Sequence, residues 1–125
     1  MLESLKIEGT INPPSIYFDT ENNIFKISGK SMPEDAVEFY QPIIKWVDEF
    51  SSTPIPNAKF EVVLEYFNTA SSKLILNIIK KIGESSSDIS IDWHYMEDDE
   101  DMLDIGEYLS EILGEGVVNI ILDED

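Results

Sequence analysis

The sequence contains no cysteine and no arginine. Without cysteine, disulfide bonds, thiolate metal sites and thiol catalysis are excluded. Without arginine, the chain lacks the planar fork that binds a phosphate group through two parallel hydrogen bonds. No run approaches the roughly 20 apolar residues that a membrane helix needs, and the N-terminus lacks the basic region and apolar stretch of a signal peptide. We therefore expect a cytoplasmic protein.

Positive charge is scarce and confined to one part of the chain. The 125 residues carry 8 lysines and 26 acids, a formal net charge of -18. Residues 1–81 hold all eight lysines and 11 acids, whereas residues 82–125 hold 15 acids and no lysine. Such a surface repels nucleic-acid phosphates and anionic lipids. We therefore expect no nucleic-acid partner and no membrane partner.

The hydrophobic content, by contrast, is that of an ordinary globular protein. With 42% hydrophobic and 27% charged residues, the chain fits a single domain over residues 1–125. Short β-rich runs, amphipathic segments and turn residues give the order β-β-β-α-β-α-β-α-β. This order predicts an α/β fold with a single mixed β-sheet flanked by helices. The strands are expected at residues 2–7, 15–19, 24–28, 60–67, 89–95 and 117–122.

Three segments carry apolar residues at helical spacing. The first follows a Ser-Met-Pro-Glu segment that predicts a capping box between Ser31 and Glu34, and Pro42 is expected to kink or divide this helix. The third is expected to begin at Asp98 or Asp99. The buried face of the second helix is formed by four isoleucines, Ile75, Ile78, Ile79 and Ile82. In the third helix, four residues are expected to point inward: Met102, Ile105, Leu109 and Ile112.

Gly29-Lys30-Ser31 lies between a predicted strand and a predicted helix, as a phosphate-binding loop does. That motif needs a further glycine five positions earlier, where Ile24 stands. We therefore expect no nucleotide site there and no cofactor.

One alternative hypothesis is a small hydrolase or isomerase. His94 is the only histidine, and Asp92 alternates onto the same face of its predicted strand. In such an enzyme Asp92 or a distant carboxylate would orient His94 for acid–base catalysis. Because a base-assisted nucleophile also needs a defined cleft, which the sequence does not show, we favour a packed or half-exposed histidine and predict no catalytic residue.

Another alternative is an acidic scaffold or metal-binding module. The run Glu97–Asp101 offers five carboxylates, but it lacks the alternation and the central glycine of a calcium-binding EF-hand loop. Carboxylates in the first turn of a helix are stabilised by the amide dipoles without any metal. We therefore predict no metal site.

The most informative segment is Asn-Thr-Ala-Ser-Ser-Lys at residues 68–73, which leads from a strand into a helix. One interpretation is that one of its polar side chains caps the helix. The other is phosphorylation, because a phosphate at a helix N-terminus meets free amides and a favourable dipole. A helical wheel places five residues opposite the isoleucine face, where Leu76 is expected to be exposed and the group would form a small docking surface: Thr69, Ser72, Lys73, Leu76 and Lys80.

At these residues the sequence resembles the SiaC-family regulatory phosphoproteins, bacterial partner-switch proteins similar in fold to STAS-type anti-sigma-factor antagonists. The likeness spans nearly the whole chain, and the residues that carry it are 11–19, 25–31, Tyr40, Pro42, Trp46 and Tyr66–Lys73. It implies that a Ser/Thr protein kinase phosphorylates Thr69 and that a metal-dependent Ser/Thr phosphatase removes the phosphate. It also implies that the unphosphorylated form binds and activates a diguanylate cyclase.

We therefore predict a non-catalytic switch with Thr69 as the phosphoacceptor. Its partner-binding residues are expected to be Asn68, Ser71, Ser72, Lys73, Leu76 and Lys80. Ala70 interrupts the run of hydroxyls, so modification of Ser71 or Ser72 stays open. An anti-sigma-factor antagonist of the STAS type stays the alternative function, because no residue selects a cyclase as the partner.

Overall fold

The computed structural model describes residues 3–9, 14–52, 55–86, 88–114 and 116–123. Its element order is the one predicted, with six strands and three helices within those residues. The elements are β1 (Leu5–Ile7), β2 (Ser15–Asp19), β3 (Ile24–Ser31), α1 (Ala36–Ser52), β4 (Lys59–Phe67), α2 (Thr69–Glu84), β5 (Ser90–Met96), α3 (Glu100–Leu113) and β6 (Val118–Asp123). Leu2, the first residue of the first predicted strand, lies outside the described residues.

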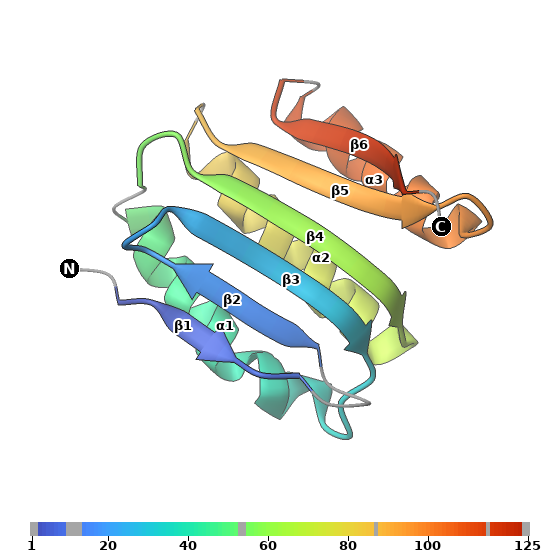
Figure 1. The fold of residues 1–125 in the computed structure, drawn as a ribbon, viewed down its shortest axis with the longest axis horizontal. Coiled ribbons are helices and arrows are strands. Elements are labelled where there is room, and N and C mark those ends of the chain that lie inside the picture. Colours follow the sequence, from blue (N-terminus) through green and yellow to red (C-terminus); the bar gives the residue numbers. More distant parts are fainter. Residues whose placement is uncertain (1–2, 10–13, 53–54, 87, 115, 124–125) are drawn as a thin grey trace.

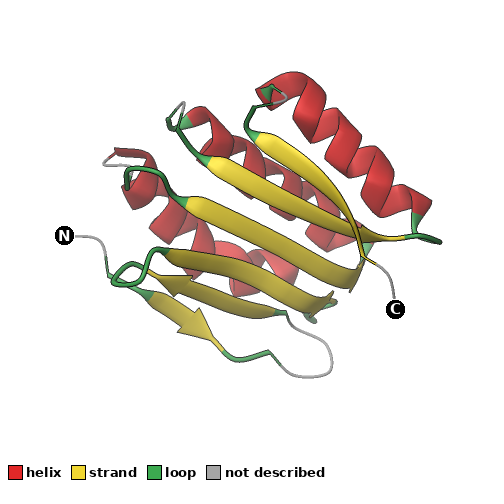
Figure 2. Ribbon diagram, turned by 45° about the horizontal axis from the view of Figure 1, so that its top comes forward, coloured by secondary structure: helices red, strands yellow, loops and turns green. Residues whose placement is uncertain are grey.

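The strands form one mixed sheet in which spatial order follows chain order, from β1 to β6. The pairs β1–β2 and β2–β3 are antiparallel, and the pairs from β3 to β6 are parallel. Successive right-handed crossovers in one direction along a sheet place every helix on the same face. Figures 1 and 2 show this arrangement, with α1, α2 and α3 on one face and the other face uncovered. The predicted single mixed sheet is confirmed.

The hydrophobic core lies between this sheet and its helices. In β4 the alternate residues Phe60, Val62 and Leu64 are buried, as the period of two in a strand requires when one face is covered. Trp46 of α1 stacks on Phe50 with ring centroids 5.4 Å apart, which adds aromatic packing to the burial of apolar surface. Among the described residues, no helix combines the length and the apolar composition that crossing a bilayer would require.

The start of α1 differs from the prediction. Ser31 is the last residue of β3 and not a helix cap, because pairing with β4 continues as far as Ser31 opposite Phe67. The helix begins five residues later, where the carboxylate of Asp35 accepts a hydrogen bond from the amide of Glu38 at 3.1 Å. The predicted capping box between Ser31 and Glu34 is therefore wrong.

Pro42 lies inside α1, and the helix is assigned continuously from Ala36 to Ser52. The ring of Pro42 removes the amide hydrogen that would bond to the carbonyl of Glu38. Both residues are exposed, so water can satisfy that carbonyl. The proline therefore does not divide the helix.

Candidate functional site

The N-terminus of α2 lies where β4 ends, at the carboxyl edge of the parallel strands. Asn68 is the N-cap, and its side-chain oxygen accepts a hydrogen bond from the amide of Ser71 at 2.9 Å. Its own amide donates to the carbonyl of Ser31 at 3.0 Å, so the cap is fixed to the end of β3. The prediction that a residue of this segment caps the helix is confirmed, and that residue is Asn68.

Thr69 is the first residue of α2, and its side chain lies outside the described part of the structure. The first amides of a helix lack partners within the helix, and the dipole makes that end attractive to anions. A residue at this position therefore lies where backbone amides can help to hold a phosphate.

A buried hydroxyl pair lies behind the cap. The hydroxyl oxygens of Ser31 and Tyr40 are 2.6 Å apart, and both side chains have no exposed surface. Burial raises the pKa of Tyr40 to about 12, because the phenolate would lose its hydration, while the hydrogen bond with Ser31 opposes that rise. Ser31 therefore links α1, through Tyr40, to the amide of Asn68.

The predicted partner-binding residues of α2 do not share one surface. Lys73 and Lys80 are exposed, and Ser72 is half-buried. Ser71 is fully buried, and its hydroxyl has no hydrogen-bond partner among the described residues. A kinase or a docking partner needs an accessible side chain, so we leave Ser71 out of the surface considered below.

The expectation that Leu76 is exposed is wrong. Leu76 is half-buried and packs against the hydrophobic core. It lies on the same stripe of α2 as Gly83, seven residues later, and a Cβ atom at Gly83 would be only 2.6 Å from Leu113 of α3. A helical wheel considers one helix at a time, so it does not show that α3 lies against this flank of α2.

Two exposed residues beside the helix N-terminus were missing from the prediction. Lys30 and Tyr66 face each other in the register of β3 and β4, and 50% of Tyr66 is exposed. Tyr66 lies one residue before the end of β4. The sequence signal for Lys30 is its position at the end of a β-rich run, directly before the buried Ser31.

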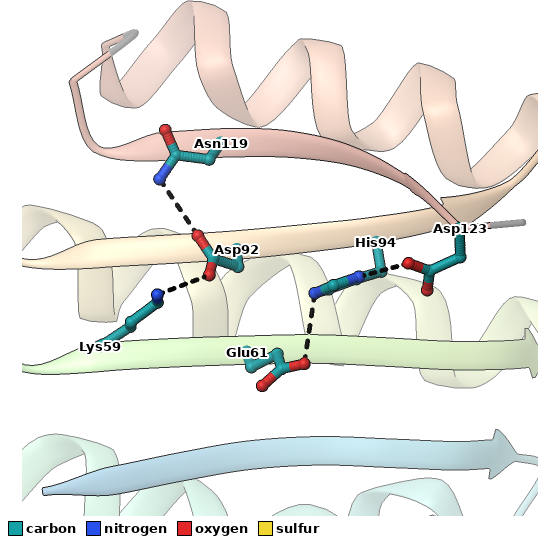
Figure 3. A network of polar contacts seen from close by, with 6 residues as sticks. All are labelled: Lys59, Glu61, Asp92, His94, Asn119 and Asp123. Carbon is teal, nitrogen blue, oxygen red and sulfur yellow. Dashed lines mark hydrogen bonds and ion pairs between the residues drawn. The ribbon is translucent and has the colours of Figure 1, made fainter.

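His94 and Asp92 lie on the uncovered face of the sheet, but they do not pair with each other. His94 lies between two carboxylates, with Nδ1 2.8 Å from Asp123 Oδ1 and Nε2 3.3 Å from Glu61 Oε1. Asp92 instead binds Lys59 at 3.3 Å and accepts a hydrogen bond from the amide group of Asn119 at 3.1 Å (Figure 3). Asp92 is therefore not the partner of His94, and the carboxylates that contact this histidine come from Asp123 and Glu61.

The acidic run before α3 has a structural role in this fold. Asp99 is the N-cap, and its carboxylate accepts a hydrogen bond from the amide of Met102 at 3.1 Å. Glu100 and Asp101 occupy the first turn, where the helix dipole favours negative charge. Within the described residues, no group of three or more histidine and acidic side chains is arranged to hold a metal ion.

Comparison with known proteins gives a family match over most of the chain. The family model described as "SiaC family regulatory phosphoprotein" matches residues 7–122. An uncharacterized protein of Pseudomonas aeruginosa (strain UCBPP-PA14) is 27% identical over 113 residues, which cover 88% of this chain and 90% of the relative.

Solved structures show the same fold. A chain in the crystal structure of the diguanylate cyclase SiaD in complex with its activator SiaC, from Pseudomonas aeruginosa, matches with a TM-score of 0.81 and 27% identity. That match covers 95% of this chain and 99% of the other. The crystal structure of apo-SiaC from the same organism matches with a TM-score of 0.74 and 27% identity over 94% of this chain and 98% of the other.

Proposed function

The chain belongs to the SiaC family of regulatory phosphoproteins, and from that membership we propose that it is a non-catalytic switch controlled by phosphorylation of Thr69. In this proposal a Ser/Thr protein kinase adds the phosphate and a metal-dependent phosphatase removes it. The unphosphorylated protein binds and activates a diguanylate cyclase. Support for that partner comes from the likeness to a chain of the SiaD–SiaC complex.

The observation that carries the choice of residue is the position of Thr69 directly after the Asn68 cap. Because Asn68 is tied to β3 as well as to α2, the backbone before Thr69 has a fixed place at the end of the sheet. Amides of the first turn can hold a phosphate there, so the modification is compatible with the fold.

The effect on a partner follows from charge. A phosphate adds about -1.5 to -2 charges and a shell of tightly held water to this end of the sheet. Lys30 and Lys73, which are exposed, offer a docking partner two of the eight positive charges in the chain. A phosphate beside them neutralises that attraction and repels acidic groups of the partner, and a loss of about 1.4 kcal/mol already weakens binding tenfold.

The test is binding of the purified chain to a diguanylate cyclase from its own cell, measured by calorimetry together with cyclic-di-GMP synthesis. Thr69→Asp should lower affinity at least about tenfold and reduce activation in step, whereas Thr69→Ala should bind and activate. Asn77→Asp is the matched control, because it adds the same charge to an exposed position on the same helix.

Phosphosite mapping completes the test. Protein recovered from the native cell should carry phosphate on Thr69, and Thr69→Ala should lose the phosphorylated form. Full affinity of a folded Thr69→Asp variant, or phosphate located elsewhere, would contradict the proposal. Phosphate-sensitive binding to an anti-sigma factor with no effect on any cyclase would support the STAS-type alternative.

A further inference from the structure

The two edge strands of the sheet differ in how they are protected. An edge strand presents unpaired amides and carbonyls, and proteins usually protect it by shortness, lysine, proline or a bulge. At one edge, β1 has three residues and includes the exposed Lys6. At the other, β6 has six residues without lysine or proline, and its register with β5 is unbroken.

The backbone of β6 has three outward-facing residues, and because the amide of Val118 donates to the carbonyl of Gly114, Ile120 and Leu122 are the two whose amide and carbonyl are both left for a partner. The amide of Ile91 donates to the carbonyl of Val117 at 2.7 Å, so alternate residues from Val117 onward bond to β5. Ile120 and Leu122 lie between those residues, and their amides and carbonyls therefore point to the free edge. Within the described residues, β6 has a strand neighbour on one side only.

Beside this edge α3 presents an apolar flank. Ile112 was predicted to point inward, but 40% of it is exposed, and that prediction is wrong. It lies one turn after Tyr108, which is 48% exposed, and α3 packs over β5 and β6 with no further helix beyond it among the described residues (Figure 1). Leu122 of β6 is 42% exposed. Apolar surface thus borders the unpaired backbone.

The charge around this edge is of one sign. The outward arc of α3 consists of four exposed acids at helical spacing, Glu100, Asp104, Glu107 and Glu111. No lysine or arginine occurs anywhere in residues 82–125. A second copy of the chain would bring the same negative field to the interface, whereas a positively charged partner is attracted to it.

We propose that β6 and the Tyr108–Ile112 flank of α3 form a docking edge for an extended, basic segment of a partner protein. The segment pairs with β6 as a seventh strand, through the outward groups of Ile120 and Leu122. Its apolar side chains, on one face, pack against Tyr108 and Ile112. Side chains that alternate with the apolar ones point to the opposite face of the sheet, so the lysine or arginine residues that complement the acids of α3 lie at the ends of the paired stretch. This edge is separate from the N-terminus of α2 and does not depend on the phosphorylation of Thr69.

The probe is a fluorescein-labelled peptide of alternating serine and valine with two lysines at each end, and its binding to the full chain is followed by fluorescence anisotropy. A peptide of the same composition with all valines at one end keeps the charge but lacks the strand pattern. The alternating peptide should bind at least about tenfold more tightly. Equal affinity for the two peptides would overturn the proposal.

Two double variants separate local charge from net charge. Glu107→Lys/Glu111→Lys should weaken binding of the alternating peptide at least about tenfold, whereas Glu34→Lys/Glu49→Lys makes the same change in net charge away from α3 and should leave affinity within about twofold. Tyr108→Ser, at an exposed position, should also weaken binding. An equal loss in both double variants would show attraction by net charge alone and would refute the docking edge.

Hydrogen exchange locates the contact. On addition of the peptide, the amides of Ile120 and Leu122 should gain protection, while those of Asn119 and Ile121, already bonded to β5, should change little. Protection that appears at β1 instead would contradict the proposal. So would a dimer of the free chain in sedimentation that Ile112→Asp abolishes, because the occupant of the edge would then be a second copy.

Discussion

The hydroxyl oxygens of Tyr40 and Ser31 lie 2.6 Å apart in the core, where neither side chain touches solvent. The carbonyl of Ser31 in turn accepts the amide of Asn68. This pair connects the second turn of α1 to the residue that precedes the proposed phosphoacceptor.

Tyr40→Phe should destabilise the protein by about 1–3 kcal/mol, because the hydroxyl of Ser31 is then buried without its partner. Urea unfolding followed by tryptophan fluorescence measures the change. Tyr66→Phe is the matched control, since Tyr66 is half exposed and its hydroxyl group can be hydrated. An equal loss in the two variants would show that the buried pair contributes nothing specific.

Because the pKa of Tyr40 is raised in the folded protein, we expect the protein to lose stability in alkali. The pKa of this tyrosine is raised from 10 in the unfolded chain to about 12 in the folded protein, so its contribution is complete below pH 10 and is lost as the pH rises to 12. The loss should be on the order of 2 kcal/mol. Urea unfolding at pH 9 and at pH 11.5 should show it as a difference between wild type and Tyr40→Phe. Parallel pH profiles of the two proteins would contradict the assignment.

Asn68→Ala should cost about 1 kcal/mol, because the amide of Ser71 loses the oxygen that caps α2. Asn68→Asp keeps an acceptor at the same place and adds a charge that the helix dipole favours, so its stability should be close to wild type. Thermal unfolding of the three proteins checks this order. Equal losses of stability in the two variants would show that the side-chain oxygen at residue 68 does not cap the helix.

Gly106→Ala should destabilise the protein by about 1–3 kcal/mol, since overpacking forces neighbours to move. A Cβ atom at Gly106 would lie 2.5 Å from Cδ1 of Trp93, a rigid buried ring whose Nε1 already donates to the carbonyl of Met102. Gly116→Ala is the control, because its Cβ atom would meet open space. Chemical denaturation of both variants should separate them clearly.

Asp19→Asn should make the protein less sensitive to acid. The carboxylate of Asp19 accepts hydrogen bonds from the side chain and backbone of Asn22, from Tyr17 and from the backbone of Glu21, and these bonds hold its pKa below 3.8. The stabilisation is complete above pH 3.8 and is lost as the pH falls through the folded-state pKa. Acid titration by circular dichroism should show a shallower transition in the variant than in wild type.

Sequence periodicity was enough to predict the fold because each element has one covered face. Alternation in β4 and helical spacing in α2 report which residues turn toward the core, and both patterns hold in the structure. The strand β3 extends past its predicted end because pairing with Phe67 of β4 stabilises Ser31 in an extended conformation. That pairing joins segments far apart in the chain, and local capping signals do not contain it.

The errors at Leu76 and Ile112 have one cause. A hydrophobic pattern gives the side of a helix that meets the sheet, but it does not tell which flank meets another helix. In the middle of the row, α2 has a neighbour on each side, and Leu76 is covered; at the end of the row, α3 leaves Ile112 open. Whether a helix flank is buried depends on the order of the strands in space, because that order sets which helices are neighbours. The hydrophobic pattern of one sequence does not give this order directly.

The agreement between spatial order and chain order also has a consequence for synthesis. Each strand of the sheet joins the one made just before it, so the growing chain can add elements to an existing template as it leaves the ribosome. Pairing partners that are near in the chain reduce the loop entropy lost before contact, and they favour rapid assembly. The N-terminus of α2, with the proposed phosphoacceptor, should therefore take its final form as soon as β6 has joined the sheet.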